Sequence, residues 1–426
     1  MEDIGRVIYG GIYEPNSPLS NKKGIRKDVL KKVQELKPTI IRWPGGNFAS
    51  GYHWKDGIGS KEKRPTTFDL AWREVKTNEF GTDEFIEFCK EIGAEPYICV
   101  NLGNGTPEEA AEWVEYCNRN HSTQWAEKRK MYGHSKPYKV KYWGLGNEIW
   151  GDWQIGHKDA IDYAKVAHEA GKMMKWVDPS IELILSGWTD PEWNRIVIER
   201  NYGLAKYISF HRYDGDDTYY GTLSAPKLLE KDIQQLSSLI KSIKSCQKPW
   251  GTLFIKPIED MYIAVDEWNI WYRKGFEDKK RKGESYTEEF YNLRDALYAG
   301  IVLNIFQRHC NEVKIANLAQ LVNTIGAIYT TPNKSFYQPI YWPLKIYREH
   351  CQNISLEVEV DSLSYNPENF KESGGKIRDD YQKIKDVPYL DVSASVSEKE
   401  DILTLCVVNR HKDENIETEI DLRNFS

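Results

Sequence analysis

The chain has 426 residues, of which 40% are hydrophobic and 29% charged, and it carries a formal net charge of -6. This composition excludes a disordered chain, and the length allows one large barrel with a smaller domain or two to three ordinary domains. The sequence shows no stripe of lysine and arginine and no apolar run long enough for a membrane helix, so we expect neither nucleic acid nor a membrane as partner.

Seven scattered cysteines form no CxxC pair, and the chain begins without a recognisable signal peptide. Both features favour reduced thiols in a cytoplasmic protein over a disulfide scaffold or a zinc ribbon. Aromatic residues make up 13% of the chain, with 15 Trp and 26 Tyr. Sugars stack on aromatic rings, so this content is a mild indication of carbohydrate binding, although a large core would explain it equally well.

Short apolar runs alternate with helix-period segments between residues 25 and 350. The first helix spans 29–36 and ends at Pro38, and later helical patterns cover 85–92, 107–118, 158–176, 228–243, 287–308 and 338–350, with a further short helix between residues 185 and 207. The alternating strands are predicted at 39–43, 96–100, 140–143, 182–185, 207–210, 262–265 and 313–316. Seven strands that alternate with helices indicate parallel βαβ units.

This pattern predicts an α/β fold, a (β/α)8 TIM barrel whose first strand is missing. A doubly wound open sheet is the alternative, but no strand is followed by a GxGxxG or P-loop motif. After residue 352 the helical period stops, and strand-like runs appear at 354–360 and 402–408. We therefore expect a catalytic barrel over residues 1–350 and an incomplete C-terminal β-sandwich domain over residues 351–426.

Two glutamates follow predicted strands of the barrel. Glu148 lies in YWGLGNEIWGDWQ and Glu267 in IAVDEWNIWY, and each is flanked by tryptophan. A barrel would bring both to one mouth, where paired carboxylates about 5–5.5 Å apart hydrolyse glycosidic bonds with retention of configuration. A structural ion pair is the alternative for either residue taken alone.

Other polar residues follow the same strands. Asn147 could donate to a sugar 2-hydroxyl, and a Tyr213 hydroxyl could hold the nucleophile ionised. The glycines of RWPGGNF would expose Arg42 and Asn47, although a structural turn explains this motif equally well. His211 in SFHRY could be structural. We predict no metal site and no cofactor, because no HExxH or calcium-binding loop is present, and GxSxG is absent as well.

At these residues the sequence closely resembles the α-L-arabinofuranosidases of glycoside hydrolase family 51. The blocks that carry the resemblance are YGGIYEP, IRWPGGNFASGYHWKDGIG, LAWREVKTNEFGTDEF, WGLGNEIWGDWQIGH, SFHRY, DEWNIWY and ANLAQLVN. The resemblance implies a (β/α)8 barrel with a β-sandwich, with Glu148 as general acid/base and Glu267 as nucleophile. It also implies that the substrate is bound by Glu2, Arg42, Asn47, Trp72, Asn147, His211, Tyr213, Trp271 and Gln320.

The resemblance further implies arabinofuranosyl-containing oligosaccharides as substrates, a cytoplasmic location and a homo-oligomer, often a hexamer. It places the acid/base on the fourth strand, whereas Glu148 follows the third predicted strand here. We therefore expect a chain that lacks the first strand and ends within the sandwich. The alternative functions are a related endoglucanase or xylosidase, and a non-catalytic carbohydrate-binding fragment.

Overall fold

The computed structural model of the chain describes residues 1–120, 122–215, 218–273, 287–367 and 381–422. Its centre is a parallel sheet of seven strands, in the order β1-β4-β5-β6-β7-β8-β9. The strands are β1 (Ile40–Trp43), β4 (Glu95–Val100), β5 (Tyr142–Leu145), β6 (Glu182–Ser186), β7 (Tyr207–Asp214), β8 (Tyr262–Ile270) and β9 (Val313–Leu318). All seven predicted strands are confirmed.

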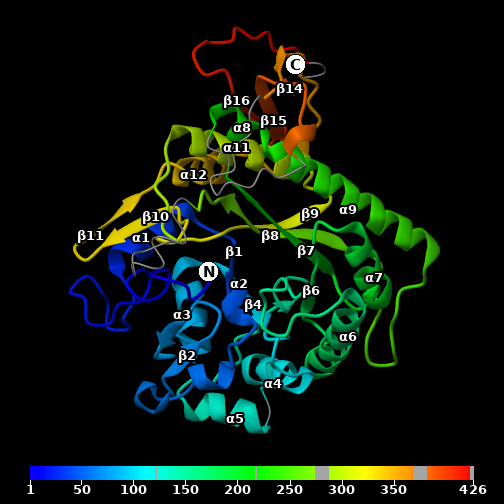
Figure 1. Cartoon of the computed structure of the whole chain (residues 1–426). Coiled ribbons are helices and arrows are strands. Elements are labelled where there is room, and N and C mark those ends of the chain that lie inside the picture. The colour runs from blue at the N-terminus through cyan, green and yellow to red at the C-terminus, as the bar shows by residue number, and fades with distance from the viewer. Residues whose placement is uncertain (121, 216–217, 274–286, 368–380, 423–426) are drawn as a thin grey trace.

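The sheet curves into a nearly closed barrel with helices on its outside (Figure 1). Neighbouring strands pair in parallel from β1 to β9. Across the remaining gap, Asn317 of β9 donates its side-chain amide to the carbonyl oxygen of Ile40 in β1 at 3.5 Å. The predicted barrel architecture is confirmed, and the alternative of an open doubly wound sheet is wrong.

The helices cover the barrel with their apolar faces. In α1 (Lys27–Leu36) the buried side chains are Val29, Val33 and Leu36, at the spacing of one helical face. The other predicted helices are α3 (Thr82–Ile92), α4 (Pro107–Asn118), α6 (Ala160–Val177), α7 (Pro191–Asn201), α9 (Pro226–Cys246), α11 (Leu293–Arg308) and α12 (Tyr341–His350). Sequence reasoning missed α5 (Gln124–Met131), α8 (Tyr219–Ser224) and two hairpins, β2 (Thr67–Asp69) with β3 (Glu74–Lys76) and β10 (Ile328–Thr331) with β11 (Lys334–Tyr337).

The inside of the barrel has an apolar layer at one end and a polar mouth at the other. The apolar layer consists of the buried side chains of Tyr97, Ile184, Tyr207, Ala264 and Ile315, which come from five different strands. Such a layer packs the barrel like a core, so no pore remains along its axis. Polar chemistry is therefore confined to the carboxyl ends of the strands.

Two strands extend further toward this mouth than their sequence predicts. The predicted ends were residues 210 and 265, whereas β7 reaches Asp214 and β8 reaches Ile270. The register of β7 against β8 shifts between Ser209 and His211, and that of β8 against β9 shifts after Val265. A strand end that contains polar residues cannot be recognised as an apolar run. In addition, β-bulges near active sites change the direction of the side chains beside them. Consequently His211, Tyr213 and Glu267 lie within strands rather than after them.

A smaller β region follows the barrel. Strands β12 (Ile354–Leu356), β15 (Leu390–Val396) and β16 (Leu403–Asn409) form an antiparallel sheet next to α11 (Figure 1). The prediction of a strand over 354–360 is wrong beyond Leu356, because the chain leaves β15 there and Glu357, Glu359 and Val360 become exposed. Residues 368–380 and 423–426 of the expected second domain lie outside the described residues, and the division at residue 350 stays a prediction.

Among the residues that the structure describes, the helices are all too short or too polar to cross a membrane.

Candidate active site

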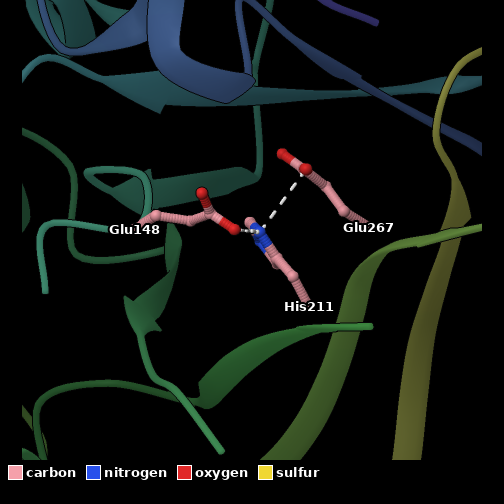
Figure 2. Close-up of side chains that lie close together, drawn as sticks. All are labelled: Glu148, His211 and Glu267. Atoms are coloured by element: carbon pink, nitrogen blue, oxygen red, sulfur yellow. Dashed lines mark hydrogen bonds and ion pairs between the residues drawn. The ribbon is translucent and has the colours of Figure 1, made fainter. Parts of the chain in front are cut away.

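Glu148 and Glu267 face each other across the barrel mouth, and His211 lies between them (Figure 2). The Nδ1 atom of His211 is 2.8 Å from Oε1 of Glu148 and 3.4 Å from Oε2 of Glu267. One carboxylate oxygen of each glutamate and this nitrogen all lie within 4.8 Å of one another. An oxygen-to-oxygen distance of at most 4.8 Å fits the roughly 5–5.5 Å between the carboxyl groups of retaining glycosidases better than the roughly 6.5–9.5 Å of inverting ones.

Glu267 is a buried carboxylate that accepts two hydrogen bonds and also faces His211. Arg42 donates from Nη1 to Oε1 at 2.7 Å, and the hydroxyl of Tyr213 donates to Oε2 at 2.6 Å. Burial alone would raise the pKa of Glu267, but His211, Arg42 and Tyr213 together lower it below its ordinary value. The carboxylate is therefore ionised and fixed in orientation, as a nucleophile requires.

Asn147 shares Arg42 with Glu267. Its Oδ1 atom accepts a hydrogen bond from Nη2 of Arg42 at 2.7 Å. Its Nδ2 atom is buried and has no hydrogen-bond partner within the described ranges. A buried amide donor of this kind is rare unless a ligand completes it. Asn147 can thus donate a hydrogen bond to a molecule bound in the mouth.

The backbone of Glu148 is in the left-handed region, with φ of 41°. A non-glycine residue in this region is strained by about 1–3 kcal/mol, and such strain is concentrated at functional sites. The amide of Gly151 donates to the carbonyl oxygen of Glu148 at 2.7 Å, which closes a tight turn. Beside this turn, Trp150 stacks on Trp188 with ring centroids 4.4 Å apart. The turn directs the Glu148 side chain into the mouth rather than along the strand.

Glu2 is the centre of a second group of side chains at the same mouth. Its carboxylate accepts hydrogen bonds from the amide of Phe48 at 3.0 Å, from Trp72 Nε1 at 2.6 Å and from Gln320 Nε2 at 3.4 Å. Gly46 makes room for this carboxylate, because a Cβ atom on Gly46 would lie only 2.0 Å from it, and its φ is 61°. Burial and the nearby charge of Glu267 raise the pKa of Glu2 to about 8.

Asn47 and Trp271 lie at the edge of these two groups. Asn47, between Gly46 and Phe48, accepts a hydrogen bond from Gln154 Nε2 at 2.5 Å. Trp271 follows β8 and packs edge-on against Tyr213, with ring centroids 5.9 Å apart. All eleven residues that the sequence singled out are therefore connected, directly or through one neighbour, around a single mouth.

Sequence reasoning missed three residues that support the site. Asp266 and Tyr97 lie beneath His211 and Arg42, and Gln154 holds Asn47. Asp266 had a usable signal, since it is a charged residue directly after the apolar run 262–265 and next to Glu267. Tyr97 and Gln154 had none, because a tyrosine within a strand and a glutamine within a loop are ordinary surface or core residues.

Glu148, His211 and Glu267 are also the described residues that come closest to a set of metal ligands. In this arrangement, however, the imidazole Nδ1 points at both carboxylates, and Arg42 and Tyr213 donate to the oxygens of Glu267. A proton on the imidazole is therefore enough to join these three groups without a bound metal ion.

A parallel barrel with two facing carboxylates at its carboxyl-terminal mouth is the arrangement of retaining barrel glycoside hydrolases. Two family models match the chain, the α-L-arabinofuranosidase 1 domain over residues 32–226 and the α-L-arabinofuranosidase C-terminal domain over residues 266–426. The chain belongs to the α-L-arabinofuranosidases of glycoside hydrolase family 51.

Three relatives illustrate this membership. The intracellular exo-α-(1→5)-L-arabinofuranosidase 1 of Bacillus subtilis is 38% identical over 438 residues, which cover 100% of this chain and 83% of that protein. The α-L-arabinofuranosidase of Thermotoga maritima, solved with arabinose, superposes with a TM-score of 0.87 at 43% identity, covering 96% of this chain and 80% of that one. The thermostable family 51 α-L-arabinofuranosidase of Thermotoga petrophila superposes with a TM-score of 0.86 at 42% identity, covering 97% of this chain and 81% of that one.

Proposed function

We propose that the chain is a retaining, exo-acting α-L-arabinofuranosidase that removes terminal arabinofuranosyl groups from oligo- and polysaccharides. The observation that carries this proposal is the pair of Glu148 and Glu267. Each offers a carboxylate oxygen that lies within 4.8 Å of one on the other residue across the mouth. The relative from Bacillus subtilis is named for exo-cleavage of α-(1→5)-linked arabinofuranose, which supports the substrate class.

The proposed reaction has two displacements. Glu148 gives its proton to the leaving oxygen while Glu267 attacks the anomeric carbon and forms a covalent arabinosyl ester. Glu148 then takes a proton from water, the resulting hydroxide attacks the same carbon and breaks its bond to Glu267, and arabinose leaves with its configuration retained while Glu267 is again a carboxylate. Arg42 and Tyr213 keep Glu267 ionised before the attack.

The remaining residues are proposed to bind the sugar. Asn147 offers its open amide donor to a hydroxyl next to the anomeric carbon. Glu2 and Gln320 present polar groups for the other hydroxyls, while Asn47, with Trp72 and Trp271, closes the sides of the pocket. Because Glu2 carries a pKa of about 8, it can both donate to and accept from a hydroxyl at neutral pH.

Two broader properties belong to the same proposal. A cytoplasmic location is supported by the relative from Bacillus subtilis, which is named as intracellular. A homo-oligomer is supported by exposed large apolar side chains near β11 and α12, namely Phe336, Trp342 and Ile346, and the hexamer is what the family resemblance implies. Light scattering of the purified protein would measure the mass directly, and a monomer at micromolar concentration would contradict the oligomer.

The function is tested with a panel of aryl glycosides. We expect hydrolysis of aryl α-L-arabinofuranosides, with retained configuration by proton NMR, and no hydrolysis of aryl glucosides or xylosides. Preferred hydrolysis of a pyranoside would favour the endoglucanase or xylosidase alternative. Binding of arabino-oligosaccharides without any turnover would favour a carbohydrate-binding protein.

The two glutamates are tested with leaving groups of different acidity. For Glu267→Ala we expect a loss of at least about 10⁴-fold in kcat/KM on every substrate, because no nucleophile remains. For Glu148→Ala we expect a loss of about 10²–10⁴-fold on poor leaving groups, but little loss on dinitrophenolate, which needs no proton. Equal losses in both variants with all leaving groups would contradict the assigned roles.

A further inference from the structure

Asp266 is a buried carboxylate directly beneath the two glutamates. It is 2% exposed and comes from β8, next to Glu267. Its Oδ2 atom accepts a hydrogen bond from the hydroxyl of Tyr97 at 2.7 Å and lies 3.2 Å from Nε of Arg42. Its Oδ1 atom is 3.0 Å from Nε2 of His211. Asp266 therefore contacts both cations that hold the catalytic carboxylates, but neither carboxylate itself.

His211 has carboxylates at both ring nitrogens. Nε2 faces Asp266, while Nδ1 faces Glu148 and Glu267. A carboxylate can only accept, so each contact to an ionised carboxylate requires a proton on the nitrogen. Burial lowers the pKa of His211, but Glu267, Asp266 and Glu148 outweigh it and raise this pKa to about 10. The imidazole is thus doubly protonated at neutral pH.

We infer that Asp266 is a positioning residue for the proposed hydrolysis, which acts by holding the proton on Nε2 of His211 so that the Nδ1–H group remains directed at Glu148 and Glu267. This inference rests on the proposed function. With Asp266 ionised, the charges of Arg42 and His211 balance those of Asp266 and Glu267. Burial would raise the pKa of Asp266, but Arg42, His211 and Tyr97 lower it to about 2, so its charge persists at all working pH values.

The surroundings of His211 include other charged and titratable groups on every neighbouring strand. These groups are Glu2, Arg42, Tyr97, Cys99, Glu148, Tyr213 and Glu267. Among them only Glu148 and Glu267 lie on the Nδ1 side of the ring within ion-pair distance. Among the described residues, Asp266 is the one acidic group within ion-pair distance of Nε2. Removing its charge should therefore lower the pKa of His211 and release the second proton near neutral pH.

The test is Asp266→Asn, which keeps the shape and removes the charge. The ratio of wild-type to variant kcat/KM for an aryl arabinofuranoside should rise with pH. It should be small near pH 5, where His211 of the variant keeps both protons, and about 10- to 100-fold near pH 8, the usual effect of losing an orienting carboxylate. A ratio that stays constant with pH would mean a merely structural role and would overturn the inference.

Asp83 offers a matched control. It is also a buried carboxylate with tyrosine and histidine neighbours, since it accepts from Tyr116 at 2.9 Å and from Tyr138 at 2.6 Å and lies 3.6 Å from His134. It is in α3, outside the barrel mouth. Asp83→Asn should lower the melting temperature without changing the pH dependence of kcat/KM. A pH-dependent loss in this variant as well would count against a specific role of Asp266.

A spectroscopic measurement keeps the inference testable without activity. In ¹⁵N-labelled protein, the ring nitrogens of His211, assigned with His211→Gln, should both carry protons at about pH 7 in the wild type and should lose one in Asp266→Asn. A neutral His211 in the wild type would overturn the inference even if the variant does not fold. If the wild type fails to hydrolyse arabinofuranosides, the proposed function fails, whereas the NMR result still decides the role of Asp266.

Discussion

Two buried networks of charged and polar side chains differ in completeness, one at the mouth of the barrel and one between α11 and the C-terminal sheet. We call Arg42, Asn147, His211, Asp266 and Glu267 the mouth cluster. We call Asn304, Arg308, Asp391, Ser393 and Arg410 the α11–β15 cluster, because it joins α11 to the C-terminal sheet.

The α11–β15 cluster is saturated. Asp391 accepts from Asn304 at 2.7 Å and Arg410 at 2.8 Å, and it lies 3.2 Å from Arg308. The hydroxyl of Ser393 donates to Asn304 at 2.5 Å. Within the described part of the chain, none of its buried side-chain nitrogens and oxygens lacks a partner. A complete network of this kind stabilises one structure and leaves nothing for a ligand.

The mouth cluster is incomplete. Asn147 Nδ2 is buried without a partner in the described residues, as is Gln320 Oε1 in the neighbouring group around Glu2, and Glu148 has a strained backbone. Unpaired buried groups cost about 1–3 kcal/mol each when nothing binds them. The comparison indicates that open polar atoms, rather than buried charges, distinguish the binding site from the structural network.

The largest expected difference between the two clusters is in how a substitution changes the free energy of unfolding. Asp391→Ala should lower the free energy of unfolding by about 3–5 kcal/mol, because Arg308 and Arg410 lose their buried counter-charge. The kcat/KM of the folded fraction should not change, since the cluster does not reach the mouth. Thermal unfolding followed by circular dichroism, combined with active-site titration, measures both quantities. A loss of kcat/KM per active site in Asp391→Ala would show that the two clusters are coupled.

A smaller effect is expected at the open atom of the mouth cluster. Asn147→Ala should raise the free energy of the transition state by about 1–3 kcal/mol, which reduces kcat/KM roughly 5- to 150-fold, because the sugar 2-hydroxyl loses its donor. With a 2-deoxy arabinofuranoside the same variant should lose much less. Measuring kcat/KM of the wild type and of Asn147→Ala on both substrates isolates the contribution of the hydrogen bond between Asn147 and the 2-hydroxyl. If Asn147→Ala loses equally on both substrates, Asn147 acts only by holding Arg42.

The barrel could be predicted from the sequence because its strands are apolar runs. The seven strands and eight of the covering helices follow from hydrophobic periodicity, and Glu148 and Glu267 were found because each follows such a run. The extensions of β7 and β8 could not be found, since bulges and polar residues at the mouth break the apolar pattern. Strand β15 (LDVSASV) was missed for a similar reason, because Ser393 and Ser395 are buried through hydrogen bonds rather than through hydrophobicity.

The chemical roles of the residues at the mouth are harder to predict from the sequence than the position of the mouth in the barrel. His211 follows from a motif, but its charge depends on Asp266 and on two glutamates that are remote along the chain. A pairing between atoms of different strands is fixed only when the sheet register is fixed. For this reason the resemblance to a family supplied residue roles that periodicity could not supply.

The smallest effect concerns the charge balance of the mouth. Four acids meet there, Glu2, Glu148, Asp266 and Glu267, whereas the described cationic side chains in ion-pair contact with them are Arg42 and His211. Asp391, by contrast, has two arginines, and Glu230 lies 3.1 Å from Arg308. Burial first, and then the charge of the neighbouring Glu267, raises the pKa of the least compensated acid, which is Glu2, to about 8.

Because this pKa is raised above the ordinary value of 4.5, the folded state holds a proton that the unfolded chain has already lost. Glu2 therefore destabilises the fold increasingly as pH rises from about 4.5 to 8, by about 1.4 kcal/mol for each pH unit. In Glu2→Gln this dependence should disappear, so the variant gains stability relative to the wild type between about pH 6 and pH 7. Chemical unfolding of both proteins at these two pH values measures the gain. A constant difference would mean that Glu2 is ionised throughout, and that the mouth tolerates its excess of negative charge.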